Sequence, residues 1–256
     1  MMSERSKARC ILVPIDLHGI NRSTLETLVR IARQLDRELV GLLLEDSRLQ
    51  QVAELPFTTE ITLSSGQERS LLRDHLSQRH SQVSAATRKL LHELAQRDQV
   101  TLSFEDAAGA RWHTAFERDG QLDIFFPARQ RWHTATASHP KKGGIIKRLG
   151  VLLPENQSHS DAITTAASLV RAGLVGDIYV LSDRPPLPEQ LHDLYRQGHQ
   201  VRLQANFNYS TTDLTTLIRQ SPYDLLLIPR ECLQDIPAEL LDAALDKSGG
   251  QVLITN

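Results

Sequence analysis

A basic stretch between residues 129 and 148 holds the side chains of this sequence best suited to bind an anion. Its cationic and titratable residues are Arg129, Arg131, His133, His139, Lys141, Lys142, Lys147 and Arg148. Arginine and lysine bind phosphates and carboxylates through charge-assisted hydrogen bonds. The stretch is therefore a candidate phosphate-binding loop, and the alternative interpretation is a charged, solvated linker between two domains.

The pentapeptide Arg-Trp-His-Thr-Ala occurs twice, at 111–115 and at 131–135, and these copies contain both tryptophans of the chain. The first copy falls at the predicted start of a helix, and the second falls just after a predicted strand. Because the copies lie on different kinds of element, we interpret the repeat as coincidence, with each tryptophan packing a loop onto a sheet. The second copy nevertheless supplies Arg131 and His133 to the candidate phosphate loop.

No complete catalytic or metal-binding motif is present in the sequence. The chain has 10 histidines, but His75 and His80 lie five positions apart, which turns them to different faces of a helix. The sequence lacks the H-x3-H and H-E-x-x-H zinc patterns and the G-x-S-x-G turn of serine hydrolases. Cys10 and Cys232 are far apart and are expected to be reduced thiols. We therefore predict no catalytic residues, no metal and no enzyme activity.

Composition limits the class of protein and its partners. The chain has 256 residues, of which 40% are hydrophobic and 23% charged, as in a folded protein of one large domain or two ordinary ones. The net charge of −2 gives no electrostatic reason to expect nucleic acid as a partner. No apolar run is long enough for a signal peptide or a membrane span. We expect a cytoplasmic protein with neither a membrane nor a nucleic acid as partner.

Short apolar runs alternate with helical patterns along the whole chain. The runs expected to be strands are 10–16, 38–46, 100–105, 122–127, 148–155, 177–183, 200–207, 223–229 and 251–256. Continuous apolar strands indicate a sheet that is covered on both faces, and strand–helix alternation indicates right-handed crossovers between parallel strands. The sequence therefore predicts an α/β protein with two doubly wound, Rossmann-like parallel-sheet domains in tandem.

The two halves of the chain align on shared landmarks, and the first half is longer. Pro14 and Asp123 are 109 positions apart, whereas Pro154 and Asp224 are 70 apart. The difference predicts an insertion at about 47–98, with a long helix from about Gln67 to Arg97. Its apolar stripe comprises Leu71, Leu72, Leu76, Val83, Leu90, Leu91 and Leu94. This helix either covers the sheet or protrudes at its first half to contact a partner or a second copy.

The end of the first half is also unusual. Residues 128–147 show neither a helical apolar face nor a clear strand, although the second half has a helix and a final strand at the equivalent place. We predict a first domain over 8–142 that lacks its last helix and strand, and a second over 146–256. The exposed edge of the first sheet would then be covered by the second domain or by another subunit, because bare edges invite pairing. A homodimer, or another protein partner, is therefore expected.

These features resemble the tandem form of the universal stress protein family. The residues that carry the resemblance are "LVPID" at the end of the first strand, "LLLED" and "VLSD" at the end of the second, "LDIFF" and "YDLLLI" opening the fourth, and the closing "QVLIT". The resemblance covers nearly the whole chain, apart from the insertion and 128–147. It implies two Rossmann-like domains and a stress-associated, regulatory role.

Members of the family that bind ATP carry G-x2-G-x9-G-[ST] after the fourth strand, and this sequence departs from that pattern in both halves. Glycines allow backbone N–H groups to approach phosphates, whereas proline removes such a donor. Pro127 and Gln130 replace glycines in the first half, and Pro229 and Cys232 replace them in the second. At the end of the second-half motif, Ala238 and Glu239 replace Gly-Ser/Thr, and the carboxylate of Glu239 would repel phosphates.

The resemblance also implies a base-binding role for the acidic residue that ends the first strand. Asp16 matches that residue, and Glu155 is its counterpart in the second half. Asp16 could equally cap the loop that follows it. We therefore expect a non-catalytic regulatory or binding protein without a cofactor. The alternative binds ATP or AMP with Asp16 on the base and the Arg129–Lys142 loop on the phosphates, and a nucleotide or phosphoester hydrolase ranks third.

Overall fold

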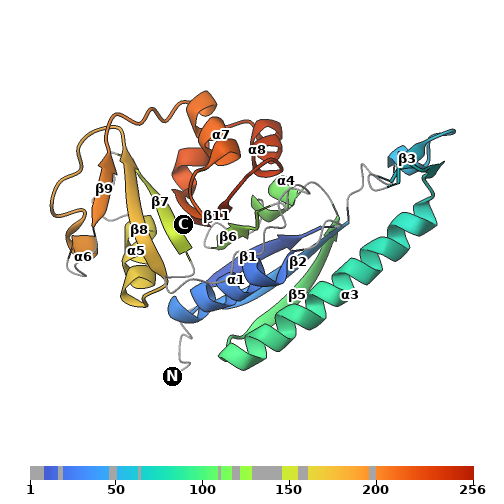
Figure 1. Cartoon of the computed structure of the whole chain (residues 1–256), viewed down its shortest axis with the longest axis horizontal. Helices are drawn as coiled ribbons and strands as arrows, with labels where there is room; N and C mark the ends of the chain where they lie inside the picture. The colour runs from blue at the N-terminus through green and yellow to red at the C-terminus, as the bar shows by residue number, and fades with distance from the viewer. Residues whose placement is uncertain are drawn as a thin grey trace, which may run out of the picture.

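In the computed structural model, one large sheet runs through the molecule (Figure 1). The structure describes residues 9–16, 20–45, 51–62, 65–108, 111–116, 122–128, 146–154, 161–195 and 200–256. These described residues form a nine-stranded sheet in the order β5-β2-β1-β6-β11-β10-β7-β8-β9. Its strands are β1 (Cys10–Ile15), β2 (Glu38–Glu45), β5 (Leu102–Ala108), β6 (Asp123–Phe126), β7 (Ile146–Leu153), β8 (Val175–Ser182), β9 (Val201–Gln204), β10 (Leu225–Pro229) and β11 (Gln251–Thr255).

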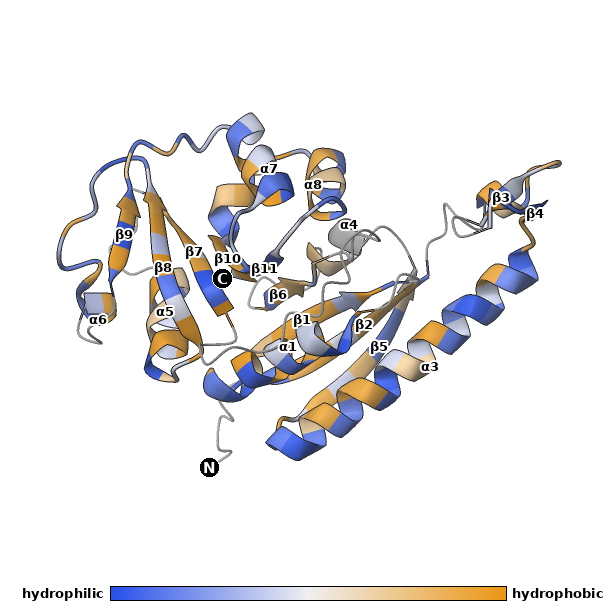
Figure 2. Ribbon diagram, viewed as in Figure 1, coloured by the Kyte–Doolittle hydropathy of each residue, from blue (hydrophilic) through white to orange (hydrophobic). Residues whose placement is uncertain are grey.

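Helices cover both faces of this sheet. The helices on one face are α1 (Arg22–Gln34), α3 (Arg73–Asp98), α5 (Asp161–Arg171) and α6 (His192–Tyr195). Those on the other face are α4 (Arg111–Phe116), α7 (Thr211–Gln220) and α8 (Ala238–Leu245), and the short 3-10 helix η1 (Arg230–Leu233) follows β10. The central strands are therefore apolar on both sides (Figure 2), which is the physical reason for their continuous hydrophobic runs.

The strand order is the same in both halves of the chain. Counted within each half, the strands lie in the order third, second, first, fourth, and β11 follows as a fifth strand in the second half. This is the order in which a Rossmann sheet begins. The predicted parallel pairing is confirmed within each half. The strands of both halves are hydrogen-bonded into a single sheet, and the division into two domains stays a prediction.

The two halves meet at β6 and β11, which are antiparallel. Phe126 pairs with Val252 and Ile124 pairs with Ile254. β6 thus has β1 on one side and β11 on the other, which leaves no place beside it for a fifth strand of the first half. Because this pairing is antiparallel, the carboxyl ends of the strands in the two halves lie at opposite edges of the sheet.

A buried ion pair lies at this joint. The side chains of Asp123 and Arg37 are only 1% and 9% exposed, and the guanidinium of Arg37 donates to the Asp123 carboxylate. The other carboxylate oxygen of Asp123 accepts a hydrogen bond from the backbone N–H of Asn256 at 3.3 Å. Burial raises the pKa of Asp123, while the charge of Arg37 opposes the rise. Asp123 therefore ties the start of β6 to the end of the chain.

The predicted insertion forms an extended arm. Its long helix, α3, begins at Arg73 and not near Gln67, because residues 68–70 form a strand, β4 (Glu68–Ser70), that pairs with β3 (Thr59–Ile61). This hairpin was not predicted. The second half of α3 buries Leu91 and Leu94 against the sheet. Figure 1 shows the first half of α3 extending away from the sheet, with the hairpin at its tip.

Candidate functional site

The strand order places two candidate binding sites in the molecule. In doubly wound sheets, ligands bind outside the carboxyl ends of the strands, where the strand order reverses. This switch point lies between β1 and β6 in the first half and between β7 and β10 in the second. Because the carboxyl ends of the halves lie at opposite edges, the two candidate sites are separate.

The first switch point contains two of the residues predicted from the sequence. Asp16 directly follows β1 and is half-buried, and Pro127 directly follows β6 and is buried. The strands are parallel, with Ile11 opposite Asp123, so Asp16 and Pro127 follow them at the same edge. The other predicted residues, Arg129, Arg131, His133, Lys141, Lys142 and Glu155, lie outside the described residues.

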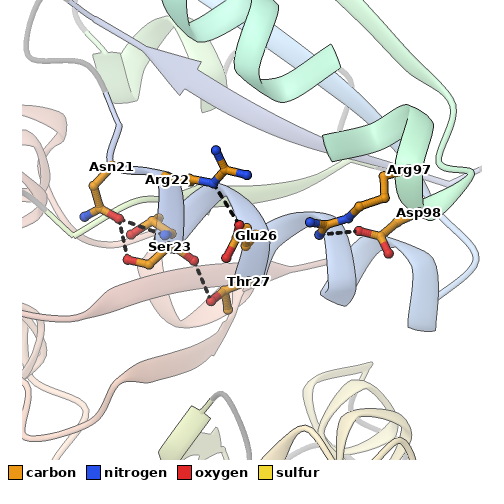
Figure 3. Close-up of polar contacts among 8 residues, drawn as sticks. Asn21, Arg22, Ser23, Glu26, Thr27, Arg97 and Asp98 are labelled. Atoms are coloured by element: carbon orange, nitrogen blue, oxygen red, sulfur yellow. Dashed lines mark hydrogen bonds and ion pairs between the residues drawn. The ribbon is translucent and has the colours of Figure 1, made fainter. Parts of the chain in front are cut away.

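Helix α1 begins close to this edge, and its amino terminus is capped by its own side chains (Figure 3). The carboxamide oxygen of Asn21 accepts hydrogen bonds from the backbone N–H of Thr24 and from the Ser23 hydroxyl, both at 2.8 Å. Arg22 forms an ion pair with Glu26 at 3.0 Å within the first turn. An anion at this terminus would have to displace the Asn21 cap, so α1 is not an open phosphate-binding helix end.

The loop 205–210, between β9 and α7, lies at the carboxyl edge of the second half, beside the second switch point. The backbone N–H of Phe207 donates to the carbonyl oxygen of Ser182 at 2.8 Å, and the Tyr209 hydroxyl donates to that of Leu181 at 2.9 Å. The rings of Phe207 and Tyr209 pack edge to face, with their centroids 5.3 Å apart. These contacts hold the loop against the carboxyl end of β8.

Tyr209 is the titratable residue of this loop. Burial raises the pKa of its hydroxyl, and negative charge on Cys232 or Asp183 would raise it further. A backbone hydrogen bond from Leu153, at the end of β7, opposes the rise. Tyr209 thus lies near the ends of β7 and β8, and it keeps its proton at neutral pH.

The segment after β10 carries charges of both signs. The Nη2 group of Arg230 donates to the carbonyl oxygen of Phe116 at 2.6 Å, and the guanidinium carbon lies 4.1 Å from the centroid of the Phe116 ring. Arg230 therefore contacts α4 of the first half. In contrast, Glu231 Oε1 and Asp183 Oδ1 are buried without a hydrogen-bond partner. Negative charge on these two side chains would repel phosphate.

Cys232 also follows β10 and is partly buried. Burial raises the pKa of its thiol to about 12, with a further contribution from the charge of Glu231. Only the thiolate is a nucleophile, so Cys232 is unreactive at neutral pH. Cys232 and Cys10 are both free thiols, as the sequence predicted.

We expect the raised pKa of Cys232 to make the protein less stable in alkali. The thiol of the unfolded chain ionises near its ordinary pKa of 9.0, whereas the native thiol ionises at about 12. Between these values the native state binds more protons than the unfolded state, so the free energy of unfolding falls as pH rises. Urea unfolding on either side of pH 9 measures this decline, which should be shallower in Cys232→Ala. Alkylation of Cys232 at equal rates in the native and the urea-unfolded protein would contradict the prediction.

The structure also adds residues that were not predicted to form a site. Asp183 ends the motif "VLSD", so its place after a strand was a usable signal. Nothing in the sequence around Tyr209 indicated that its loop returns to the sheet. Within the described ranges, no three His, Cys, Asp or Glu side chains are grouped so as to hold a metal ion. None of the helices in those ranges is long and apolar enough to cross a membrane.

Comparison with known proteins leaves the chain without an assigned family. No protein-family model matches it, and no curated protein matches it. Among solved structures, the chain has a neighbour in lysine monooxygenase NbtG from Nocardia farcinica, described for the conformation of its NADPH domain. The two are 14% identical, with a TM-score of 0.16, over 70% of this chain and 58% of that one. A TM-score this low carries no argument about fold or function.

Proposed function

We propose that this chain is a non-catalytic, regulatory binding protein of the tandem universal-stress type that does not bind adenine nucleotides in the family's usual way. The observation that carries the proposal is the second switch point. There, Tyr209 holds its loop against the end of β8. The carboxylate of Glu231 follows β10, where a phosphate-binding loop would be needed, and that of Asp183 follows β8, each with one oxygen buried and unpaired. A nucleotide would have to displace the loop and overcome this negative charge.

The repeated strand order supports the tandem part of the proposal. Each half has the strand order third, second, first, fourth. A tandem repeat of one domain predicts that the same order occurs twice. The final strand of the second half lies beside the fourth strand of the first, so one half completes the sheet of the other. Such an arrangement suits a protein whose halves act together as one binding module.

The chemistry of the described residues supports a non-catalytic role at this site. Burial keeps both Tyr209 and Cys232 protonated at neutral pH, so neither is a ready base or nucleophile. Arg230 is engaged by Phe116 through a hydrogen bond and a ring contact. These groups hold the loops in place and are not poised for proton or group transfer.

One observation favours the alternative of an adenine-nucleotide-binding protein. Asp16 and Pro127 lie together at the first switch point, as the resemblance implies for a base-binding aspartate beside the phosphate-binding segment. In this alternative, the side chains of Arg129, Arg131, Lys141 and Lys142 bind the phosphates in place of backbone N–H groups. The first half, and not the second, would then hold ATP or AMP.

A thermal-shift titration with ATP, ADP and AMP, with and without Mg²⁺, tests the proposal. We expect no change in the unfolding temperature, because neither half of the sequence carries the glycine pattern with which the ATP-binding members of the family bind phosphates. A ligand present at about 100 times its dissociation constant would stabilise the native state by roughly 2.7 kcal/mol, which is readily measured.

If a shift in unfolding temperature is observed, variants show at which of the two switch points the nucleotide binds. A shift that is lost in Asp16→Ala but kept in Tyr209→Phe would overturn the proposal and establish nucleotide binding in the first half. A shift that is kept in Asp16→Ala and changed in Glu231→Gln would place the nucleotide in the second half. Each variant is first compared with the parent protein without ligand, so that its own effect on stability is known.

A further inference from the structure

The tip of the arm formed by the insertion carries a group of exposed apolar side chains. We define the arm tip as residues 51–62 and 65–80, which comprise the β3–β4 hairpin, the segment before it and the first turns of α3. Its exposed apolar residues are Val52 (44% exposed), Leu55 (60%), Phe57 (99%), Ile61 (66%) and Leu72 (49%). Figure 2 shows apolar residues at this end of the arm, away from the core that the sheet and helices form.

The backbone around Phe57 holds this aromatic ring in solvent. Phe57 has a φ of 66°, in the left-handed region that bulky residues rarely adopt. The hydroxyl of the following residue, Thr58, donates to the carbonyl oxygens of Val52 and Leu55, both at 3.0 Å. These bonds fix the turn. Leu71 N–H donates to the Thr58 carbonyl oxygen at 3.0 Å and attaches the turn to the start of α3. A strained, well-bonded turn that displays an aromatic residue is typical of a functional contact.

The hairpin itself is not part of the large sheet. β3 and β4 have three residues each and form a separate two-stranded sheet. An isolated two-stranded hairpin is at best marginally stable in water, and packing against a further element is what stabilises it. Among the described residues of the arm tip, Leu76 of α3 alone is buried, so a partner surface would add to the little packing that the tip has.

The size of the apolar group matches one side of a small dimer interface. A buried phenylalanine removes roughly 200 Å² from water. The transfer energy of an aliphatic side chain, divided by about 25 cal/mol per Å², corresponds to roughly 100 Å² of apolar surface. The four aliphatic residues are about half exposed, so together they would add roughly 200 Å². Because protein interfaces are about 60% apolar, the whole contact would cover roughly 700 Å² per partner. A stable interface of ordinary size buries about 800 Å² per partner.

The balance of charge around the apolar group indicates which kind of partner it would bind. The arm tip carries four acidic residues, Glu54, Glu60, Glu68 and Asp74, and three basic ones, Arg69, Arg73 and Arg79. Two opposite pairs already neutralise each other within the arm: Arg69 with Glu60, and Arg73 with Glu54 at 2.8 Å. A surface with an apolar centre and nearly balanced charge matches another surface of the same kind, and does not attract a strongly charged partner.

We propose that the arm tip binds the arm tip of a second copy of this chain and so forms a twofold-symmetric homodimer. The same patch on both copies makes a closed contact, whereas head-to-tail insertion of the arm into a different site on the next copy would continue into a ring or a filament. Phe57 lies at the centre of the contact, with Ile61 and Leu55 beside it. The inference does not depend on the proposed function, because the arm lies outside both switch points.

Sedimentation velocity of the full chain, over a range of protein concentration, tests the proposal. We expect the parent protein to form dimers, and Phe57→Asp to raise the dimer dissociation constant by about 30-fold or more, as for a central aromatic residue of an interface. Ile61→Asp should act in the same direction. Since Phe57 is almost fully exposed in one copy, the variant should keep the circular dichroism and unfolding temperature that the parent shows as a monomer.

Leu187→Asp is the matched control, because Leu187 is 62% exposed and lies in the second half, outside the arm. This variant should dimerise like the parent. A parent protein that stays monomeric would overturn the proposal and would point to a different protein as the partner of the arm. Dimers that persist unchanged in both Phe57→Asp and Ile61→Asp would also overturn it, since the contact would then lie elsewhere on the chain.

Discussion

Replacement of Asp123 by alanine is expected to lower the free energy of unfolding by about 3–5 kcal/mol, as for other buried ion pairs that lose one partner. The substitution leaves the guanidinium of Arg37 buried and only 9% exposed, with its counter-charge removed. It also removes the acceptor for the backbone N–H of Asn256, at the end of the strand that joins the halves. Urea unfolding followed by circular dichroism measures the loss.

The equivalent aspartate of the second half provides the control for this prediction. Asp224 is exposed, and its carboxylate accepts a hydrogen bond from the backbone N–H of Arg148 at 2.9 Å. Asp224→Ala should therefore lower the free energy of unfolding by only about 1 kcal/mol. The double variant Arg37→Met, Asp123→Leu should recover most of the stability, because apolar residues can replace a buried ion pair. Equal losses for the two aspartates would contradict the prediction.

The largest loss of stability is expected for Leu253→Asp, in the middle of β11. Leu253 is fully buried, opposite Phe125 of β6 on one side and Leu227 of β10 on the other. Truncation of a buried leucine alone costs about 2–5 kcal/mol, and an unpaired buried carboxylate adds several more. Since domains are stable by about 5–15 kcal/mol, the variant should be largely unfolded at room temperature. Circular dichroism and limited proteolysis report this directly.

Leu203→Asp controls for the introduction of a carboxylate into a strand. Leu203 lies on the outer strand β9 and is 46% exposed, so the new charge stays in contact with water. Its effect on the free energy of unfolding should be below about 1 kcal/mol. A well-folded Leu253→Asp protein would show that the β6–β11 joint contributes little to stability. A first half that stays protease-resistant while the second unfolds would show that the halves are independent domains.

Local sequence patterns determined much of the architecture. The continuous apolar runs predicted all nine strands of the large sheet, because strands buried on both faces need apolar side chains on both sides. The alternation with helices predicted parallel pairing within each half, since the crossover helix returns the chain to the same edge. Comparison of the halves likewise predicted the insertion and its long helix, although the β3–β4 hairpin has strands too short to give a pattern.

The candidate site was only partly accessible from the sequence. Asp16 and Pro127 were placed correctly at one edge, because the residue that follows a parallel strand lies at the carboxyl edge of the sheet. The same rule indicated the place of Asp183 and Cys232. The rule could not indicate that the 205–210 loop returns to the carboxyl edge of the second half. The path of a loop depends on the surfaces it meets and not on a periodic pattern.

Only the tertiary structure decided how distant segments meet. The antiparallel pairing of β6 with β11 joins strands that are more than a hundred residues apart, and no local periodicity specifies such a partner. The contact of Arg230 with Phe116 follows from that joint, and the contact of Asp123 with Arg37 follows from the packing of β2, β1 and β6 within the first half. Sequence by itself determined the elements and the edge at which each one ends. Packing of the two halves decided which charges are buried, paired or left facing the candidate site.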